Sequence, residues 1–169
     1  MPRSSSLLRA LRLSATVLPV LLAAGLAAPA PAAATGPAVR HCATVVSPTR
    51  TLGQACSDRS TADALSRIAA EPGQPVDRTL LLEEYKDIDY GGGILYSFYG
   101  DAGGCDGTGY HLVNYIDVAL NVSSMKGYHD CNAVHLWSTL SVEKTMDLPA
   151  PQLGGNFNDS VRELQVFHR

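Results

Sequence analysis

The stretch EYKDIDYGGG, residues 84–93, decides how this sequence is interpreted. It places Tyr85 and Tyr90 five positions apart and ends in three glycines, a composition that suits neither a helix nor a plain strand. Glycine supplies a positive φ without a clash at Cβ, and two aromatic rings can cover a hairpin that bends over. The spacing Tyr85, four residues, Tyr90, one residue, Gly92 therefore predicts a folded hairpin rather than a binding loop.

The chain after Val76 has the texture of an all-β protein. Short apolar or aromatic runs are separated by glycine clusters, and they predict about eight short strands. The runs are TLLLEEY (79–85), GILYSFYG (93–100), YHLVNYI (110–116), NVSSMKGY (121–128), NAVHLW (132–137) and VRELQVF (161–167). Regular helices do not alternate with these runs, which excludes a parallel βαβ sheet. The segment is also too compact for an immunoglobulin sandwich of ~100 residues.

The spacing from Tyr85 to Gly92 resembles the signature of βγ-crystallin Greek keys, in which the first hairpin folds down over the sheet. Such a domain contains two consecutive keys, and NDSVR, residues 158–162, resembles the last strand of the second. The resemblance implies an all-β, βγ-crystallin-like sandwich over residues 79–169, with Greek keys at about 79–128 and 131–169. The chain is similar to secreted actinobacterial members, which are related in fold to metalloproteinase inhibitors and killer-toxin-like proteins.

The second repeat departs from the signature. Trp137 stands at the first aromatic position, but Val142 and Lys144 stand where the second aromatic residue and the glycine belong. We therefore expect the second hairpin to fold less sharply, with residues 138–150 as the less regular end of the domain.

The first 34 residues have the layout of a secretory signal peptide. Three arginines precede an apolar run over residues 13–28, and Ala32-Ala33-Ala34 offers a small-residue cleavage pattern before Thr35. A membrane anchor is the alternative, but Pro19 and Gly25 interrupt a run shorter than the ~20 residues of a spanning helix. We expect a secreted, extracellular protein with no membrane attachment after cleavage.

The mature chain is acidic. All 16 acidic residues and ten of the 13 basic residues follow the leader, which leaves a formal charge of −6. No basic segment with interleaved aromatic residues occurs, so we expect no nucleic-acid partner. We also expect a monomer in solution.

Four cysteines in an exported chain predict two disulfides. Of the three connectivities, we favour Cys42–Cys56 and Cys105–Cys131, because these pairs are nearer in sequence and each brackets one unit. A zinc site is the alternative, but neither CxxC nor HxxxH spacing accompanies the cysteines.

Residues 35–78 form the predicted N-terminal extension, stapled by the first of these disulfides. Ser60 and Asp63 make a capping box, and Pro72-Gly73 ends the segment. Between them, Ala62, Leu65, Ile68 and Ala69 share one helical face, which predicts a short helix packed on the domain.

The resemblance also implies a possible calcium site. Many microbial relatives bind calcium in each repeat through two Asn or Asp residues followed, after two positions, by two hydroxyl residues. Here residues 119–124 keep the hydroxyls and residues 158–163 keep the acidic pair. Because the loops of the family share each ion, one weak site could use Asp159, Ser123, Asn121 and Asn158. The other would join Leu120 to Arg162, where the arginine charge opposes an ion. The alternative is that both loops only close hairpins.

Sequence motifs of enzymes do not occur: the chain has no GxSxG, HExxH or P-loop. The five histidines are scattered without ligand spacing, and we assign none a catalytic role. GDAGGCDGTG, residues 100–109, is interpreted as a disulfide-closed turn rather than a calcium loop.

Three functions compete. The first is a secreted, non-enzymatic structural or binding module, with calcium as the only cofactor considered. The second is a metalloproteinase inhibitor that inserts the loop of residues 100–109 into an extracellular protease. The third is a killer-toxin-like antimicrobial, a class richer in cysteine than this chain. The fold alone does not decide among them.

Overall fold

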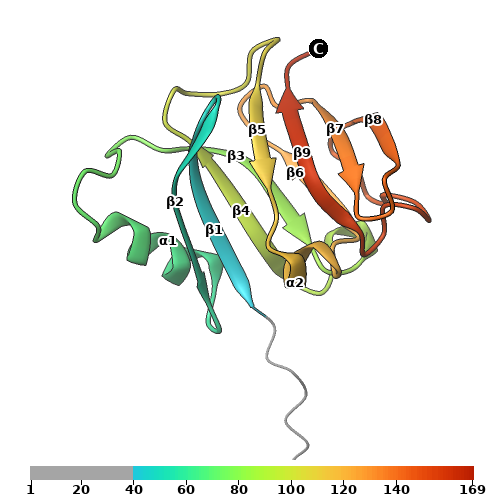
Figure 1. Ribbon diagram of the computed structural model, residues 1–169, viewed down its shortest axis with the longest axis horizontal. Coiled ribbons are helices and arrows are strands. Elements are labelled where there is room, and N and C mark those ends of the chain that lie inside the picture. Colours follow the sequence, from blue (N-terminus) through green and yellow to red (C-terminus); the bar gives the residue numbers. More distant parts are fainter. Residues whose placement is uncertain (1–39) are drawn as a thin grey trace, which may run out of the picture. The chain divides into compact units, whose positions relative to one another are not determined.

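The computed structural model describes residues 40–169 (Figure 1), all of which belong to one compact unit. The predicted signal peptide, residues 1–34, lies outside the described residues. In the described part of the chain, no helix is long and apolar enough to cross a membrane.

The protein is mostly β-sheet, as predicted, with nine strands in two sheets. The first sheet has five strands in the order β2-β1-β4-β3-β6, and the second has four in the order β5-β9-β7-β8. The strands are β1 (His41–Ser47), β2 (Arg50–Ser57), β3 (Thr79–Tyr85), β4 (Ile94–Gly100), β5 (Tyr110–Val113), β6 (Ser124–Gly127), β7 (Ala133–Ser138), β8 (Glu143–Asp147) and β9 (Val161–Phe167). Short helical turns lie at η1 (Ile88–Tyr90) and α2 (Ile116–Ala119).

The two sheets exchange strands. β5 follows β4 in the sequence but pairs with β9 in the other sheet (Figure 1). In the opposite direction, Ala150, which follows β8, forms an isolated bridge with Met125 of β6. Both N–H to O distances of that bridge are 2.9 Å. Each half of the chain therefore contributes a segment to the sheet built mainly by the other.

Residues 41–57 are part of the first sheet, and not only a lead-in to it. β1 and β2 form an antiparallel hairpin, and β1 also pairs in parallel with β4, with Cys42 opposite Tyr96. These two strands were not among those predicted from the sequence, although the β-branched run in HCATVVS is a strand signal. The extension thus completes the edge of the sheet next to β4.

Helix α1 (Thr61–Ala69) begins as predicted, because the Ser60 hydroxyl accepts a hydrogen bond from the Asp63 N–H at 3.1 Å. Its buried face was predicted in part, because Ile68 is fully buried and Leu65 packs against the same cluster. Ala64 and Ile68 are the buried residues, and they pack with Ala43 and Val45 of β1. Ala62 and Ala69 are exposed, because a helix as short as α1 touches the sheet along one i, i+4 line.

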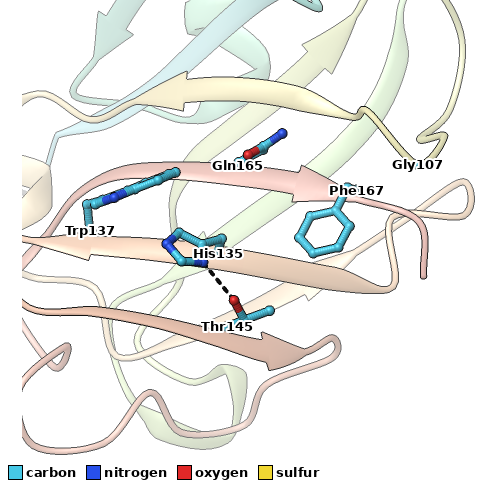
Figure 2. Close-up of a pocket in the computed structure, with 6 residues that line it drawn as sticks. All are labelled: Gly107, His135, Trp137, Thr145, Gln165 and Phe167. Carbon is cyan, nitrogen blue, oxygen red and sulfur yellow. Dashed lines mark hydrogen bonds between the residues drawn. The ribbon is translucent and has the colours of Figure 1, made fainter.

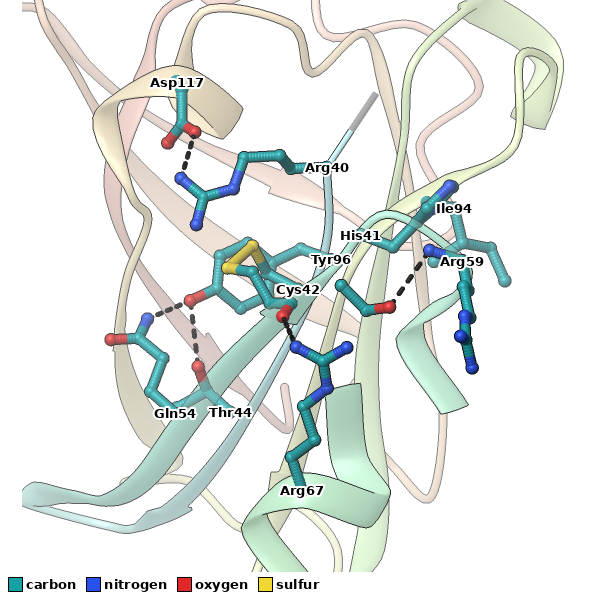
Figure 3. Close-up of a disulfide and its surroundings, with 12 residues drawn as sticks. Arg40, His41, Cys42, Thr44, Gln54, Arg59, Arg67, Ile94, Tyr96 and Asp117 are labelled. Carbon is teal, nitrogen blue, oxygen red and sulfur yellow. Dashed lines mark hydrogen bonds and ion pairs between the residues drawn. A yellow bond between two sulfur atoms is a disulfide. The ribbon is translucent and has the colours of Figure 1, made fainter. Parts of the chain in front are cut away.

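Two disulfides are present, with the connectivity that sequence proximity favoured. Cys42–Cys56 joins β1 to β2, and Cys105–Cys131 joins the segment after β4 to the start of the second half. Figure 3 shows the first disulfide beside the Tyr96 ring, whose hydroxyl bonds to Thr44 and Gln54. Arg67 of α1 also donates to the Cys56 carbonyl at 3.1 Å. The disulfide is therefore one member of a local network that holds the hairpin and α1 together.

A single main core takes apolar side chains from both sheets. Leu82 and Phe98 come from the first sheet, and Leu136 and Leu164 from the second; all four are fully buried. Glu84 of β3 is also fully buried. Asn114, which follows β5, donates from Nδ2 to Glu84 Oε1 at 3.0 Å and to the Val161 carbonyl at 3.0 Å. This amide joins the first sheet to β9 of the second.

Candidate functional site

The stretch of residues 84–93 forms a bent-over corner between β3 and β4. The rings of Tyr85 and Tyr90 meet edge to face, with centroids 5.7 Å apart, and Gly92 has a φ of 68°. A Cβ at Gly92 would lie 2.5 Å from a carboxylate oxygen of Asp87, so the position has room only for glycine. These three residues act as a structural corner in the geometry that the sequence predicted.

Ser124, the first residue of β6, holds this corner in place with two hydrogen bonds. Its hydroxyl accepts from the Tyr90 N–H at 3.0 Å and donates to the Asp87 carbonyl at 2.6 Å. Ser124 is fully buried, so the hydroxyl satisfies two backbone groups that water does not reach. From the sequence, this serine was expected only as the last residue of a calcium-binding pattern. In the structure its side chain serves the hairpin.

The two loops expected to share calcium do meet. The Asp159 N–H donates to the Val122 carbonyl at 2.9 Å, which brings residues 158–163 against residues 119–124. Asp159 adopts a left-handed backbone, with a φ of 57°. Ser123 is buried, with 6% of its surface exposed. The juxtaposition that the resemblance implied is therefore present at the level of the backbone.

The side chains of the two loops are engaged within their own loops. Asn121 donates from Nδ2 to the Asp117 carbonyl at 2.7 Å, at the end of α2. Asn158 donates from Nδ2 to Asp159 Oδ2 at 2.7 Å. Arg162 is paired with Glu163 at 3.0 Å. Within residues 40–169, no three His, Cys, Asp or Glu side chains converge as metal ligands would.

The loop of residues 100–109 is exposed at its tip and fixed at its base. Asp106, Gly107 and Thr108 are exposed, whereas Cys105 is held by its disulfide and by an N–H bond to the His129 carbonyl at 2.9 Å. Asp106 Oδ1 accepts from the N–H groups of Thr108 and Gly109, both at 2.8 Å. These backbone donors hold the pKa of Asp106 below its usual value. The result is a braced turn.

A second surface feature lies on β7, β8 and β9. Cross-strand pairing sets Gln165, His135 and Thr145 in one row and Glu163, Trp137 and Glu143 in the next. We call these six residues the Trp137 face. Figure 2 shows four of them, Gln165, His135, Trp137 and Thr145, as sticks. Trp137 also approaches His111 of β5, with ring centroids 5.9 Å apart.

Hydrogen bonds hold His135 in a fixed orientation on this face. Its Nδ1 lies 2.6 Å from the Thr145 hydroxyl, and its Nε2 lies 2.9 Å from the Glu143 carboxylate. A carboxylate only accepts, so Nε2 is the donor in the bond to Glu143, and Nδ1 pairs with the Thr145 hydroxyl. The ring also packs against the Trp137 indole, with centroids 4.3 Å apart. The side chain next to Trp137 is therefore a polar ring, that of His135, which is already held in one orientation.

Two hollows border the Trp137 indole. The larger, of about 310 Å³, is lined by Gly107, His135, Trp137, Thr145, Gln165 and Phe167 (Figure 2). The smaller, of about 190 Å³, is lined by Trp137, Ser138, Ser141, Val142, Glu143 and Arg162. Trp137 is common to both, so the indole forms the ridge between them.

This face is not predicted from the sequence, because its histidines have neither metal-ligand nor nucleophile spacing. The available signal was the period of two: His135 and Trp137, Glu143 and Thr145, and Glu163 and Gln165 each lie two positions apart. Residues two apart on a strand point to the same side. Only strand pairing, however, shows that the three doublets are neighbours.

Comparison with known proteins does not assign the chain to a family. The chain matches no protein-family model, no curated protein and no solved structure.

Proposed function

We propose that this chain is an exported, non-enzymatic βγ-crystallin-like module that works by binding. One observation carries the proposal: β5 leaves its own half to pair with β9, while Ala150 crosses over to pair with Met125. Two intertwined Greek keys, packed as a sandwich, require this reciprocal exchange. The orders β4-β3-β6 and β8-β7-β9 also repeat one arrangement in the two sheets.

The corner supports the same interpretation. A Greek key with a folded first hairpin needs aromatic cover, a glycine with positive φ and a partner on the last strand of the key. Tyr85 and Tyr90 supply the cover, Gly92 the backbone and Ser124 the partner. The two disulfides fit the oxidising space outside a cell.

Export is tested by expressing the full chain in a bacterial secretion host and measuring intact mass in the medium. The expected product begins near Thr35 and has the mass of a doubly oxidised chain. An unprocessed, reduced product that stays inside the cell would contradict the proposal.

Calcium is part of this proposal as one weak site at the junction of the two loops. Asp159 would supply the carboxylate and the loop of residues 119–124 the neutral oxygens, with an affinity of ~0.1 to 1 mM, as in extracellular calcium modules. The reagent is the secreted, disulfide-bonded protein in a calorimetric titration with calcium. Asp159→Ala should abolish the heat, while Asp58→Ala, an exposed carboxylate before α1, should leave it unchanged. Absence of heat at millimolar calcium removes the site but leaves the module.

A second candidate function is inhibition of an extracellular metalloproteinase. The braced turn of residues 100–109 favours it, because a loop held in one conformation loses little entropy on entering a cleft. Its base is fixed by Cys105–Cys131 and its interior by Asp106. The test is a panel of thermolysin-like and other metalloproteases with the purified protein. A Thr108→Arg variant should lose any inhibition, and a lack of inhibition at micromolar concentration ends this candidate.

A further inference from the structure

We propose that the Trp137 face binds a neutral oligosaccharide, with the sugar ring stacked on the indole and its hydroxyls bonded to the polar row. This inference rests on the proposed binding function and names the ligand class. Three properties of the face carry it: the position of the indole, the partners that its carboxylates already have, and the spacing of the polar groups.

The indole is placed as a stacking platform. Trp137 lines both hollows, so open space borders it on more than one side. The larger hollow, at about 310 Å³, is at the lower end of the size range of small-molecule sites. A pyranose ring has a face of C–H groups and a rim of hydroxyls. An aromatic face next to hydrogen-bonding side chains matches both parts.

The carboxylates on the face already have hydrogen-bonding or ionic partners. Glu163 is paired with Arg162 at 3.0 Å and lies 3.5 Å from His111. Glu143 accepts from His135 at 2.9 Å. A cationic ligand would have to displace these partners, whereas a hydroxyl can share the free lone pairs of each carboxylate. The arrangement favours a ligand recognised by hydrogen bonds over one recognised by its charge.

The polar groups are spaced along the face. Gln165, His135 and Thr145 lie on adjacent strands, so the row spans roughly 10 Å at the usual separation of strands. That span is comparable with a disaccharide. The three residues are direct cross-strand partners and so follow one line across the strands, which suits a straight chain with equatorial linkages better than a curved one. We therefore assign the face to β-1,4-linked glucan or N-acetylglucosamine oligomers.

The experiment uses an internal reporter, because Trp137 is the only tryptophan in the sequence. The emission of the secreted, disulfide-bonded protein is measured during titration with cellotriose and with chitotriose. Maltotriose, whose linkage curves the chain, serves as the comparison. We expect a saturable change in emission with at least one of the first two sugars and at least a tenfold weaker response to maltotriose.

Two matched threonine variants locate the response. Thr145→Val removes the hydroxyl beside His135 with little change in volume, and should raise the Kd about tenfold, the equivalent of one lost hydrogen bond. Thr51→Val on β2 makes the same change on an exposed strand of the other sheet and should leave the Kd unchanged. Trp137→Ala is followed by calorimetry, because it removes the reporter, and should abolish the heat. Circular dichroism confirms that each variant is folded.

Either of two results overturns the inference. One is an emission that responds to neither sugar at millimolar concentration. The other is a saturable response to a tri-arginine peptide with none to the sugars, which would mean that the face takes a cation. A protein that is secreted and oxidised as expected but binds no sugar loses only this inference. A protein that is retained and reduced loses the proposed function itself.

Discussion

The two hairpins that begin the two halves of this protein are built differently. Between β3 and β4, the chain bends over, and Tyr85 is left with 8% of its surface exposed. Between β7 and β8, the chain makes a plain antiparallel hairpin, with Ser138 N–H bonded to the Val142 carbonyl at 2.9 Å. The sequence predicted the milder bend but not the regular pairing of β8 within residues 138–150. Without a second aromatic residue and a glycine, the strands simply continue across from each other.

This difference accounts for the position of the candidate site. In the first half, the Tyr90 ring packs edge to face against the Tyr85 ring. In the second half, no corner folds over Trp137, and two hollows border the ring. The same departure from the pattern that makes the second hairpin plain thus leaves its aromatic residue accessible. The first half therefore has a closed corner, and the second half has the surface that we propose as a binding face.

The inward positions next to these aromatic residues differ as well. Glu84 precedes Tyr85 and Leu136 precedes Trp137, and both are fully buried. Burial raises the pKa of Glu84 to about 8, and the hydrogen bond from Asn114 opposes this shift only in part. Glu84 Oε2 and Asn114 Oδ1 have no protein partner among the described residues. The first half therefore carries a neutral carboxyl where the second carries an aliphatic side chain.

The largest expected effect on the free energy of unfolding comes from Glu84→Gln, which removes the titratable carboxyl that only the first half carries. Since the folded pKa is raised, the wild-type carboxyl favours folding fully below the unfolded pKa, and this contribution is lost as pH rises to about 8. The free energy of unfolding of the wild type, relative to the variant, should fall by about 1.4 kcal/mol per pH unit between roughly pH 4.5 and 8. Urea denaturation across that interval measures it.

Glu71→Gln is the control, because Glu71 is exposed and the variant should follow the wild type at every pH. Parallel curves for wild type and Glu84→Gln would show that Glu84 is ionised in the folded protein.

An intermediate effect is expected from Gly92→Ala, which attacks the corner that only the first half possesses. The new Cβ meets the Asp87 carboxylate and forces alanine into a left-handed backbone, so we expect a loss of about 2 kcal/mol in the free energy of unfolding. Gly93→Ala has a φ of 87° but no atom within 4 Å of its Cβ, so it reports the backbone cost alone. If thermal unfolding shows equal losses for both variants, the close packing of the corner contributes nothing.

The smallest effect is expected at the plain hairpin, with Ser141→Gly. Ser141 has a φ of 59°, a conformation in which glycine is not strained, so the variant should gain about 0.5 to 1 kcal/mol in stability. Ser141→Ala keeps the strain and should bring no gain. Calorimetry measures the Tm of both variants and of the wild type. A Tm below that of the wild type for Ser141→Gly would mean that the extra conformational freedom of glycine in the unfolded chain outweighs the relief of backbone strain.

Features that depend on a few neighbouring residues were legible in the sequence: the corner at Tyr85, Tyr90 and Gly92, the Ser60 cap, and most strands after Thr79. Which alanine of α1 is buried was not, because an alanine-rich helix offers similar neighbouring faces and packing on the sheet selects Ala64. The strand β1 was missed although its residues favour it, since its place depends on a parallel neighbour about 50 residues away.

By itself, the sequence determined the local chemistry of this protein: an all-β texture, a glycine-dependent bend, and cysteines near enough in the chain to pair. Tertiary structure alone decided which strands are neighbours, and so brought Trp137 between two glutamates and Glu84 against Asn114. The reason is physical. Backbone preferences act over a few residues, whereas the pairing of distant strands depends on which apolar faces the whole chain can bury together.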